Sequence, residues 1–180
     1  PANMKRSEPP THHLSDLLSP WTRRQRLLIP KIRLLAMDFD GVLTDNAVWV
    51  NERGEESVRC WRGDGIGLVA IRQLNIRRII ITSELNPAVL ARAEKLSIPI
   101  FQGHRKFAHL LVQGLPMEEI AYIGNDVNDL ECLKAVGLPI VTADAHLDVV
   151  QFAAYQTKAK GGYGAVREVC DMFCAVLSNG

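Results

Sequence analysis

The stretch from Ile32 to Asp45 reads IRLLAMDFDGVLTD and joins an apolar run to three closely spaced acids. The run at 32–37 predicts a buried strand. The acids that follow it are Asp38, Asp40 and Asp45. A single Asp there would be a turn former, but carboxylates two residues apart repel each other unless a cation or a proton lies between them. The stretch therefore predicts an acidic site at the carboxyl end of a buried strand.

Similar apolar runs recur along the chain and alternate with segments of helical periodicity. Strands are predicted at 32–37, 77–82, 98–101, 120–124 and 137–143, and helices at 65–74, 87–96, 106–113 and 129–136. Apolar strands that do not alternate with polar residues, each followed by a helix, indicate a parallel sheet covered on both faces. The pattern predicts a Rossmann-like, doubly wound α/β fold, whose site lies at the carboxyl ends of the strands.

A second group of acids and amides follows another predicted strand, in the sequence GNDVND at 124–129. Its members Asn125, Asp126 and Asp129 offer hard oxygen ligands at the same edge of the sheet as the first group. Such oxygens suit Mg²⁺, which also binds substrate phosphate. A carboxylate such as Asp38 can in addition be the attacking group and form an aspartyl-phosphate.

One segment interrupts the alternation of strands and helices. Residues 48–61, VWVNERGEESVRCW, predict a β-hairpin with a charged turn at Asn51–Glu56, placed directly after the first strand. Trp49, Val58 and Trp61 are bulky apolar residues on an element too small to bury them alone. Packing on the parent domain and a subunit interface are both open for them.

The chain of 180 residues predicts one main domain, at 31–180. Residues 1–30 combine a polar, proline-bearing segment with a short basic one and predict a partly disordered N-terminal arm. A loose tail and an oligomer contact are both open for this arm.

Composition excludes several classes of function. With 47% hydrophobic residues, 23% charged residues and a net charge of +1, nothing indicates nucleic acid or a membrane surface as a partner. No apolar run reaches the roughly 18 residues of a membrane helix, and the first residues lack the charged-then-apolar pattern expected of a secretion signal. Free thiols in a reducing cytoplasm are expected for the four cysteines, Cys60, Cys132, Cys170 and Cys174.

The sequence DFDGVLTD at 38–45 resembles the first motif of the haloacid dehalogenase (HAD) superfamily of phosphatases, DxDGx(T/V). The resemblance implies that Asp38 is the nucleophile and that Asp40 is the general acid and base. It also implies that Asp40 binds Mg²⁺ through its backbone carbonyl.

The other motifs of the superfamily have counterparts in the chain. Thr82 in IIITSE matches the Thr or Ser that binds the transferring phosphoryl group, and Lys106 in FQGHRKF matches the Lys that neutralises it. The spacing before Lys106 is one residue shorter than in relatives, which leaves Arg105 as an alternative. Many members have Asp where this chain has Asn125, so the resemblance implies a metal site of lower charge, in which Asp126 compensates and Asp129 orients Lys106 or a metal-bound water.

No insertion long enough for a cap domain lies between Asp38 and Thr82 or between Thr82 and Lys106. The chain resembles the capless subfamily that contains 3-deoxy-D-manno-octulosonate 8-phosphate (KDO 8-phosphate) phosphatase. The resembling segments are MDFDGVLTD, RGDGIGL, FQG, YIGNDVNDLECLKAVGL, ADAH and GGYGAVREVCD. The subfamily implies a homotetramer in which each hairpin joins a barrel shared by the subunits.

The same resemblance implies the residues that bind substrate: Asp64, Ser83, Glu84, Gly161, Gly162 and Arg167. The glycine-rich segment KGGYGAVRE at 160–168 would reach a neighbour's site and close over the sugar. The expected substrate is a phosphate of a 2-keto-3-deoxy sugar acid. TSE at 82–84 is similar to the TGE of phosphatases for nine-carbon ulosonate 9-phosphates, while the chain as a whole is similar to the eight-carbon group, so both lengths are open.

A rival interpretation comes from another class of protein. Related domains fused to CMP-sugar-acid synthetases serve in oligomerisation and have lost their phosphatase residues, and Asn125 favours such a role here. The presence of Asp38, Asp40, Thr82 and Lys106 favours an enzyme. A phosphatase acting on phosphoproteins is a third interpretation.

Overall fold

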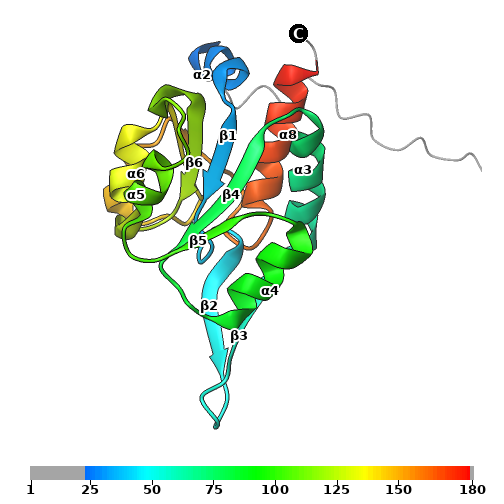
Figure 1. The fold of residues 1–180 in the computed structure, drawn as a ribbon, viewed down its shortest axis with the longest axis vertical. Coiled ribbons are helices and arrows are strands. Elements are labelled where there is room, and N and C mark those ends of the chain that lie inside the picture. Colours follow the sequence, from blue (N-terminus) through cyan, green and yellow to red (C-terminus); the bar gives the residue numbers. More distant parts are fainter. Residues whose placement is uncertain (1–22, 179–180) are drawn as a thin grey trace, which may run out of the picture.

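The computed structural model describes residues 23–178, and its centre is a six-stranded parallel sheet (Figure 1). The strand order is β5-β4-β1-β6-β7-β8. The bounds are β1 Leu34–Met37, β4 Arg77–Thr82, β5 Ile100–Gln102, β6 Ile120–Gly124, β7 Leu138–Val141 and β8 Tyr155–Gln156. Because the chain winds from β1 toward β4 on one side and β6 on the other, the crevice at the carboxyl end of β1 is the topological switch point of the sheet.

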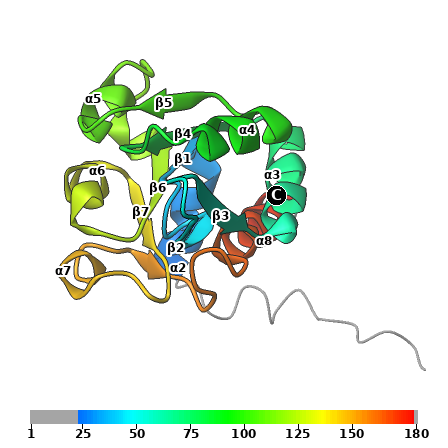
Figure 2. The ribbon, with the colours of Figure 1, turned by 90° about the horizontal axis from the view of Figure 1, so that it is seen from below.

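Helices cover both faces of the sheet (Figures 1 and 2). One face carries α3 (Arg62–Gln73), α4 (Pro87–Leu96) and α8 (Ala165–Leu177), and the other carries α5 (Lys106–Leu111), α6 (Leu130–Ala135) and α7 (Leu147–Val150). Short helices complete the set: α2 (Arg23–Leu28), η1 (Ile29–Lys31), η2 (Met117–Glu119) and η3 (Val127–Asp129). The predicted doubly wound fold is confirmed.

Strand β1 shows why this sequence forms a central strand. All four of its residues are buried. Leu35 and Met37 belong to the core beneath α3 and α8, while Leu34 and Ala36 belong to the core on the opposite face. A strand buried on both faces has no solvent side, so its sequence is apolar throughout instead of alternating.

The predicted hairpin is present and forms a separate two-stranded sheet. Its strands are β2 (Thr44–Val50) and β3 (Glu56–Cys60), with Val48 opposite Val58. The hairpin projects from the end of the body at which β1 points (Figure 1). It begins four residues earlier than predicted because Thr44 already pairs with Cys60. No cap domain is inserted within residues 23–178.

The structure adds details that the sequence pattern did not show. Strand β8 is only two residues long, too short to give an apolar pattern. The end of the predicted N-terminal arm is helical, and Ile29 is fully buried in the core. Residues 1–22 of that arm lie outside the described residues. All four cysteines are free, and none of the helices described between residues 23 and 178 has the length and hydropathy that a membrane crossing requires.

Candidate active site

The acidic loop after β1 is held by its own backbone and by Thr44. The Leu43 N–H donates to the carbonyl of Phe39 at 2.8 Å, which closes a tight turn. The Thr44 hydroxyl donates to Asp40 Oδ1 at 3.0 Å and accepts from the Gly41 N–H at 3.2 Å. Gly41 has a φ of 75°, a conformation that side-chain-bearing residues rarely adopt. The loop thus orients Asp40 through contacts between residues that are close together in the sequence.

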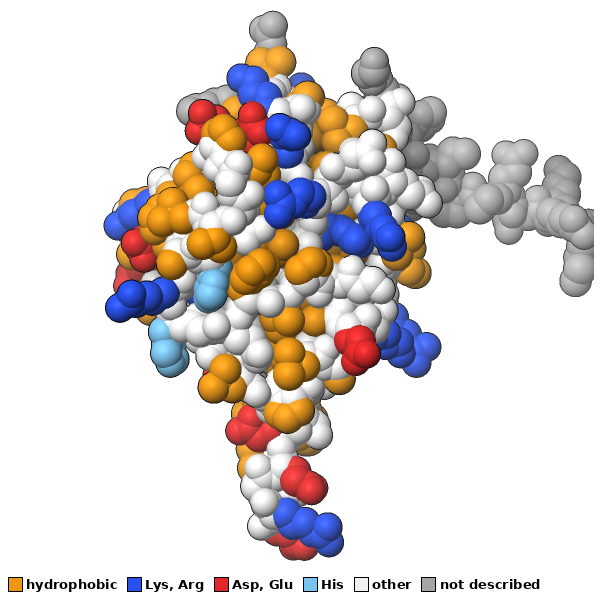
Figure 3. Space-filling model, viewed as in Figure 1, with side chains coloured by type: hydrophobic (Ala, Val, Ile, Leu, Met, Phe, Trp, Pro, Cys, Tyr) orange, Lys and Arg blue, Asp and Glu red, His pale blue; other side chains and the backbone are white. Residues whose placement is uncertain are grey.

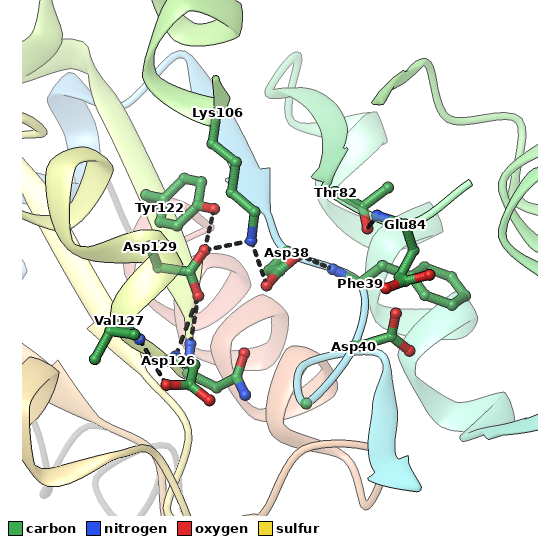
Figure 4. A network of polar contacts seen from close by, with 12 residues as sticks. Asp38, Phe39, Asp40, Thr82, Glu84, Lys106, Tyr122, Asp126, Val127 and Asp129 are labelled. Carbon is green, nitrogen blue, oxygen red and sulfur yellow. Dashed lines mark hydrogen bonds and ion pairs between the residues drawn. The ribbon is translucent and has the colours of Figure 1, made fainter. Parts of the chain in front are cut away.

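A buried lysine joins the two predicted groups of acids (Figure 4). Lys106 Nζ lies 2.6 Å from Asp38 Oδ2 and 2.8 Å from Asp129 Oδ1, and the lysine is only 2% exposed. Arg105, the alternative to Lys106, is exposed. The one-residue-shorter spacing therefore still brings Lys106 to the acidic loop, because the lysine is the first residue of α5.

Asp129 is fully buried and organises the loop that follows β6. Its Oδ2 accepts the N–H groups of Asn125 at 2.8 Å and Asp126 at 3.3 Å, and its Oδ1 accepts the hydroxyl of Tyr122 at 2.6 Å. With Lys106 this makes four hydrogen bonds to one carboxylate. Asp129 thus holds the lysine and the loop together through these hydrogen bonds, and its predicted role in catalysis stays a prediction.

Asn125 has an unsatisfied side-chain oxygen next to the acidic loop. Its Oδ1 is buried and has no hydrogen-bond partner among the described residues. Its amide lies so close to Gly41 that a Cβ there would meet Asn125 Nδ2 at 2.0 Å. Buried polar atoms are rarely left unpaired, so this oxygen indicates a ligand.

The predicted residues surround a hollow of about 160 Å³ at the carboxyl edge of the sheet. It is lined by Asp38, Asp40, Asn46, Thr82, Ser83, Glu84, Asn125, Asp126 and Asn128. A second hollow of about 210 Å³ adjoins it and shares Asp40, Asn46 and Glu84. The second hollow reaches the base of the hairpin at Glu56 and the start of α4 at Asn86. The smaller and the larger hollow therefore lie side by side.

Burial and charge shift the pKa values of this site. Burial is the main cause that raises the pKa of Asp38 to about 7, with the charge of Asp129 adding to it and Lys106 opposing it. Burial also raises the pKa of Asp40, against the hydrogen bond from Thr44. Burial lowers the pKa of Lys106, but the two carboxylates outweigh burial and leave it raised. The raised pKa values mean that the surroundings of Asp38 and Asp40 do not fully stabilise their negative charges. A bound cation would stabilise those charges and favour the ionised forms.

These donors fit Mg²⁺. Within residues 23–178, no three His, Cys, Asp or Glu side chains converge as a metal-ligand cluster. A cation here would therefore draw on Asp38, on the backbone of Asp40 and on the neutral amide oxygen of Asn125. Hard oxygens of this kind, few in number, suit an ion that keeps several waters.

Asp64 and Arg167 lie outside the hollow. Asp64 is fully buried at the start of α3, and its Oδ1 accepts the backbone N–H of Arg167 at 2.9 Å in the first turn of α8. The Arg167 side chain donates to Asp171 at 2.6 Å. Within one chain both residues join α3 to α8, and their predicted contact with substrate stays a prediction.

Gly161 and Gly162 pack against the acidic loop of the same chain. A Cβ at Gly161 would meet the carbonyl oxygen of Gly41 at 1.9 Å, and one at Gly162 would meet the Asp45 N at 2.4 Å. The Gly162 N–H donates to the carbonyl of Val42 at 3.0 Å. These glycines thus support the acidic loop, and their predicted reach into a neighbour's site stays a prediction.

Sequence reasoning missed several residues at the site. Tyr122 stands inside an apolar strand and reads as core, although its hydroxyl binds Asp129. Asn46, with a φ of 62°, and Asn128 line the smaller hollow, and Glu56 lines the larger. Asn128 lies within the GNDVND segment and could have been found there, whereas Asn46 and Glu56 carried no sequence signal.

The fold and the site together define a capless phosphatase of the HAD class. The defining features are an aspartate at the switch point of a parallel sheet, a second aspartate two residues further along and a buried lysine. No family model matches the chain. It is 38% identical over 147 residues to the 3-deoxy-D-manno-octulosonate 8-phosphate phosphatase KdsC of Salmonella typhi, covering 78% of each chain.

Solved structures give the same result. The KDO 8-phosphate phosphatase of Yersinia pestis is 34% identical with a TM-score of 0.80, covering 85% of this chain and 86% of that one. That of Moraxella catarrhalis, solved with magnesium, phosphate and KDO, is 32% identical with a TM-score of 0.82, covering 93% and 95%. The chain belongs to the KDO 8-phosphate phosphatase (KdsC) family and is a phosphoric monoester hydrolase.

Proposed function

We propose that this phosphatase hydrolyses KDO 8-phosphate or a closely similar phosphate of a 2-keto-3-deoxy sugar acid, with Mg²⁺, through an aspartyl-phosphate. The observation that carries the proposal is the buried contact between Lys106 and Asp38, at 2.6 Å, on the rim of a hollow that Asp40 and Thr82 also line. A relative solved with magnesium, phosphate and KDO supports the choice of ion and substrate.

Asp38 is the nucleophile in this proposal. One of its carboxylate oxygens forms a bond to phosphorus while the bond from phosphorus to the sugar oxygen breaks. Its Oδ1 accepts the Phe39 N–H at 2.7 Å and its Oδ2 accepts from Lys106, so the carboxylate is held in one orientation before the reaction. Preorganisation of this kind lowers the cost of reaching the transition state.

Asp40 is the acid and then the base. It donates a proton to the leaving sugar oxygen, and in the second step it takes a proton from the water that attacks phosphorus and frees Asp38. Its raised pKa favours the protonated form that the first step requires. The hydrogen bond from Thr44 holds its carboxyl group at the mouth of the hollow.

Lys106 and Thr82 bind the transferring phosphoryl group. The lysine offers a fixed positive charge beside the attacking oxygen, and the Thr82 hydroxyl already accepts the Glu84 N–H at 3.0 Å, which leaves its proton free for a phosphoryl oxygen. Asp129 keeps the lysine in place. These contacts stabilise negative charge as it develops on phosphorus.

Mg²⁺ would be held by Asp38, the backbone carbonyl of Asp40 and Asn125, with Asp126 and Asp129 contributing directly or through water. When bound, the ion neutralises the phosphoryl oxygens and keeps Asp38 ionised. The unpaired oxygen of Asn125 supports its inclusion.

The sugar acid would occupy the larger hollow, where it would meet Glu84, which lines both hollows, and lie next to Ser83, which lines the smaller one. We also propose a homotetramer, in which Asp64, Gly161, Gly162 and Arg167 help to bind substrate and the hairpins meet. The exposed apolar side chains of the hairpin support this assembly. The free thiols support a reducing, cytoplasmic location.

Phosphate release from KDO 8-phosphate and from nine-carbon ulosonate 9-phosphates, with Mg²⁺ or with EDTA, tests the proposal. Wild type is expected to hydrolyse at least one of them only with Mg²⁺. The Asp38→Asn variant keeps the size of the side chain but loses the nucleophile, so its rate should fall by about a thousandfold or more.

The same assay tests the rival function, a non-catalytic domain that partners a synthetase. Asn125 favours this role because an amide lowers the charge available to a metal. A wild-type rate equal to that of Asp38→Asn on every substrate would support the rival and rule out the phosphatase proposal.

A further inference from the structure

A groove between α3 and α4 encloses about 560 Å³ and shares no residue with the two hollows of the active site. Its lining combines five cations with apolar residues: Arg62, Gly65, Ile66, Val69, Arg72, Arg78, Arg92, Lys95, Leu96 and Ser97. The volume is within the usual range for small-molecule sites, roughly 300 to 1,000 Å³.

The positive charge of the groove is not balanced by acidic residues in its lining. No acidic residue lines it, and none of the five cations forms an ion pair within residues 23–178. The whole chain carries a net charge of only +1, so this concentration of positive charge is local. Unpaired like charges that share a groove repel one another, and a bound anion would relieve that repulsion.

Two of the arginines are partly buried in the groove wall. Arg78 donates to the carbonyl of Leu68 at 2.8 Å, and Arg92 donates to the carbonyl of Trp61 at 3.1 Å. Arg92 Nε is buried and has no partner among the described residues. These contacts fix both guanidinium groups while leaving donors available, which is the arrangement that favours bidentate binding of phosphate.

The rest of the lining is apolar. Ile66 is 63% exposed and Val69 is 54% exposed, on the face of α3 that borders the groove, and Leu96 faces them from α4. Gly65 permits the close approach of the two helices, since a Cβ there would meet Leu96 at 2.9 Å. A simple inorganic anion would make no use of these surfaces, whereas an anion with an apolar or planar body would cover them.

The basic surface continues beyond the groove. A separate hollow of about 490 Å³, distinct from those at the active site, adjoins the groove and shares Arg72 and Arg78 with it. It is also lined by Arg77 and Phe101. Figure 3 shows Lys and Arg side chains set among hydrophobic ones on this face of the molecule. Arg78 lies near the amino end of β4 and Thr82 at its carboxyl end, so this surface is separate from the catalytic edge.

We propose that the groove between α3 and α4 binds a soluble organic phosphate with a planar or apolar body, of the nucleotide type. The phosphates would lie against Arg72, Arg92 and Lys95, and the body would cover Ile66 and Val69. Arginine suits both parts of such a ligand because its planar guanidinium group pairs with phosphate and stacks on flat rings.

Titration calorimetry with ATP and with inorganic phosphate, in EDTA to prevent turnover, tests this proposal. Wild type is expected to bind ATP at least about tenfold more tightly than inorganic phosphate. The exposed pair Arg72→Glu/Lys95→Glu should weaken ATP binding by about tenfold or more, roughly 1.4 kcal/mol. The matched control is Lys31→Glu/Lys134→Glu, which makes the same change in charge at exposed positions on η1 and on α6.

Unchanged phosphatase rates will show that both variants fold. Equal loss of ATP binding in both variants would overturn the proposal, because the attraction would then be general. ATP binding no tighter than that of phosphate, or unaffected by the groove variant, would also overturn it. So would a change in molar mass of the groove variant alone by light scattering, because the groove would then be an interface between subunits.

Discussion

Asn125 sets how much negative charge the site offers to a cation. Its neighbours Asp38 and Asp129 already share one lysine, so the three side chains carry a net charge of −1 when ionised. An aspartate in place of Asn125 would make that net charge more negative and would repel Asp38. The amide therefore lowers electrostatic strain in the metal-free protein and weakens its attraction for Mg²⁺.

The Asn125→Asp variant should be less stable than wild type in EDTA, by about 1–2 kcal/mol, and should gain more stability on addition of Mg²⁺. The added carboxylate shares the hollow with Asp38 without a counter-ion in the first case and would ligate the ion in the second. Thermal denaturation with and without Mg²⁺ measures both effects. The Mg²⁺ concentration for half-maximal activity should fall.

The matched control is Asn128→Asp, which adds the same charge at an exposed position on the same hollow. It should change the response to Mg²⁺ far less, because an exposed carboxylate is screened by water. Equal responses from the two variants would mean that Asn125 Oδ1 does not ligate the ion.

Asp64 makes stability depend on pH. Burial raises its pKa to about 6, against the hydrogen bond from the Arg167 N–H, and its Oδ2 has no partner among the described residues. Between about pH 4 and pH 6 the folded chain therefore holds a proton that the unfolded chain releases. The contribution of this carboxyl group to stability falls as pH rises through that window, by up to about 3 kcal/mol.

The Asp64→Asn variant should not show this fall, because an amide does not titrate. Its free energy of unfolding, relative to wild type, should rise between pH 4 and pH 6 and stay level above that. Denaturant titrations at several pH values measure it, with Asp148→Asn at an exposed position on α7 as the control that follows wild type. A raised KM with no pH-dependent difference would instead favour the predicted contact of Asp64 with substrate.

At the scale of elements, the turn at Gly161 and Gly162 supports the acidic loop from outside. The Gly162→Ala variant should lose stability for two reasons, its φ of 65° and the 2.4 Å approach of a Cβ to the Asp45 N. Gly114→Ala has a similar φ of 67° but open space around the Cβ. Its cost should be about 1 kcal/mol, and that of Gly162→Ala about 2 kcal/mol greater.

Urea denaturation of the two glycine variants separates backbone strain from steric overlap. The phosphatase rate should fall in Gly162→Ala alone, since only that turn contacts the loop that bears Asp40. Equal losses of stability in both variants would show that the turn moves away from the acidic loop without cost.

The central elements were predictable because the pattern of apolar residues in each segment reflects how that segment is buried. Strand β1 is apolar throughout since both its faces are buried, and Asp38, Thr82 and Lys106 lie where the end of a strand or the start of a helix brings them together. Strand β8 and the contact between Asp64 and α8 were not predictable. Each depends on residues distant in the chain, which leave no local pattern.

At the scale of the whole molecule, the hairpin is apolar on both of its faces. Val48, Trp49 and Val50 are 55%, 72% and 60% exposed, and successive residues of a strand point to opposite sides. One parent domain cannot cover both sides of a projecting hairpin. Other copies of the chain can do so, which is the basis of the proposed tetramer.

The Trp49→Asp variant should dissociate the tetramer, because a charge would replace an aromatic ring that buries about 150–250 Å² at a contact. Light scattering should give four times the chain's mass for wild type and less for the variant. Activity should fall with it if, as proposed, neighbouring subunits of the tetramer close the site. Leu147→Asp is the control, since this side chain is 83% exposed on α7. A wild-type monomer with full activity, or equal effects of the two changes, would contradict closure of the site through the hairpin.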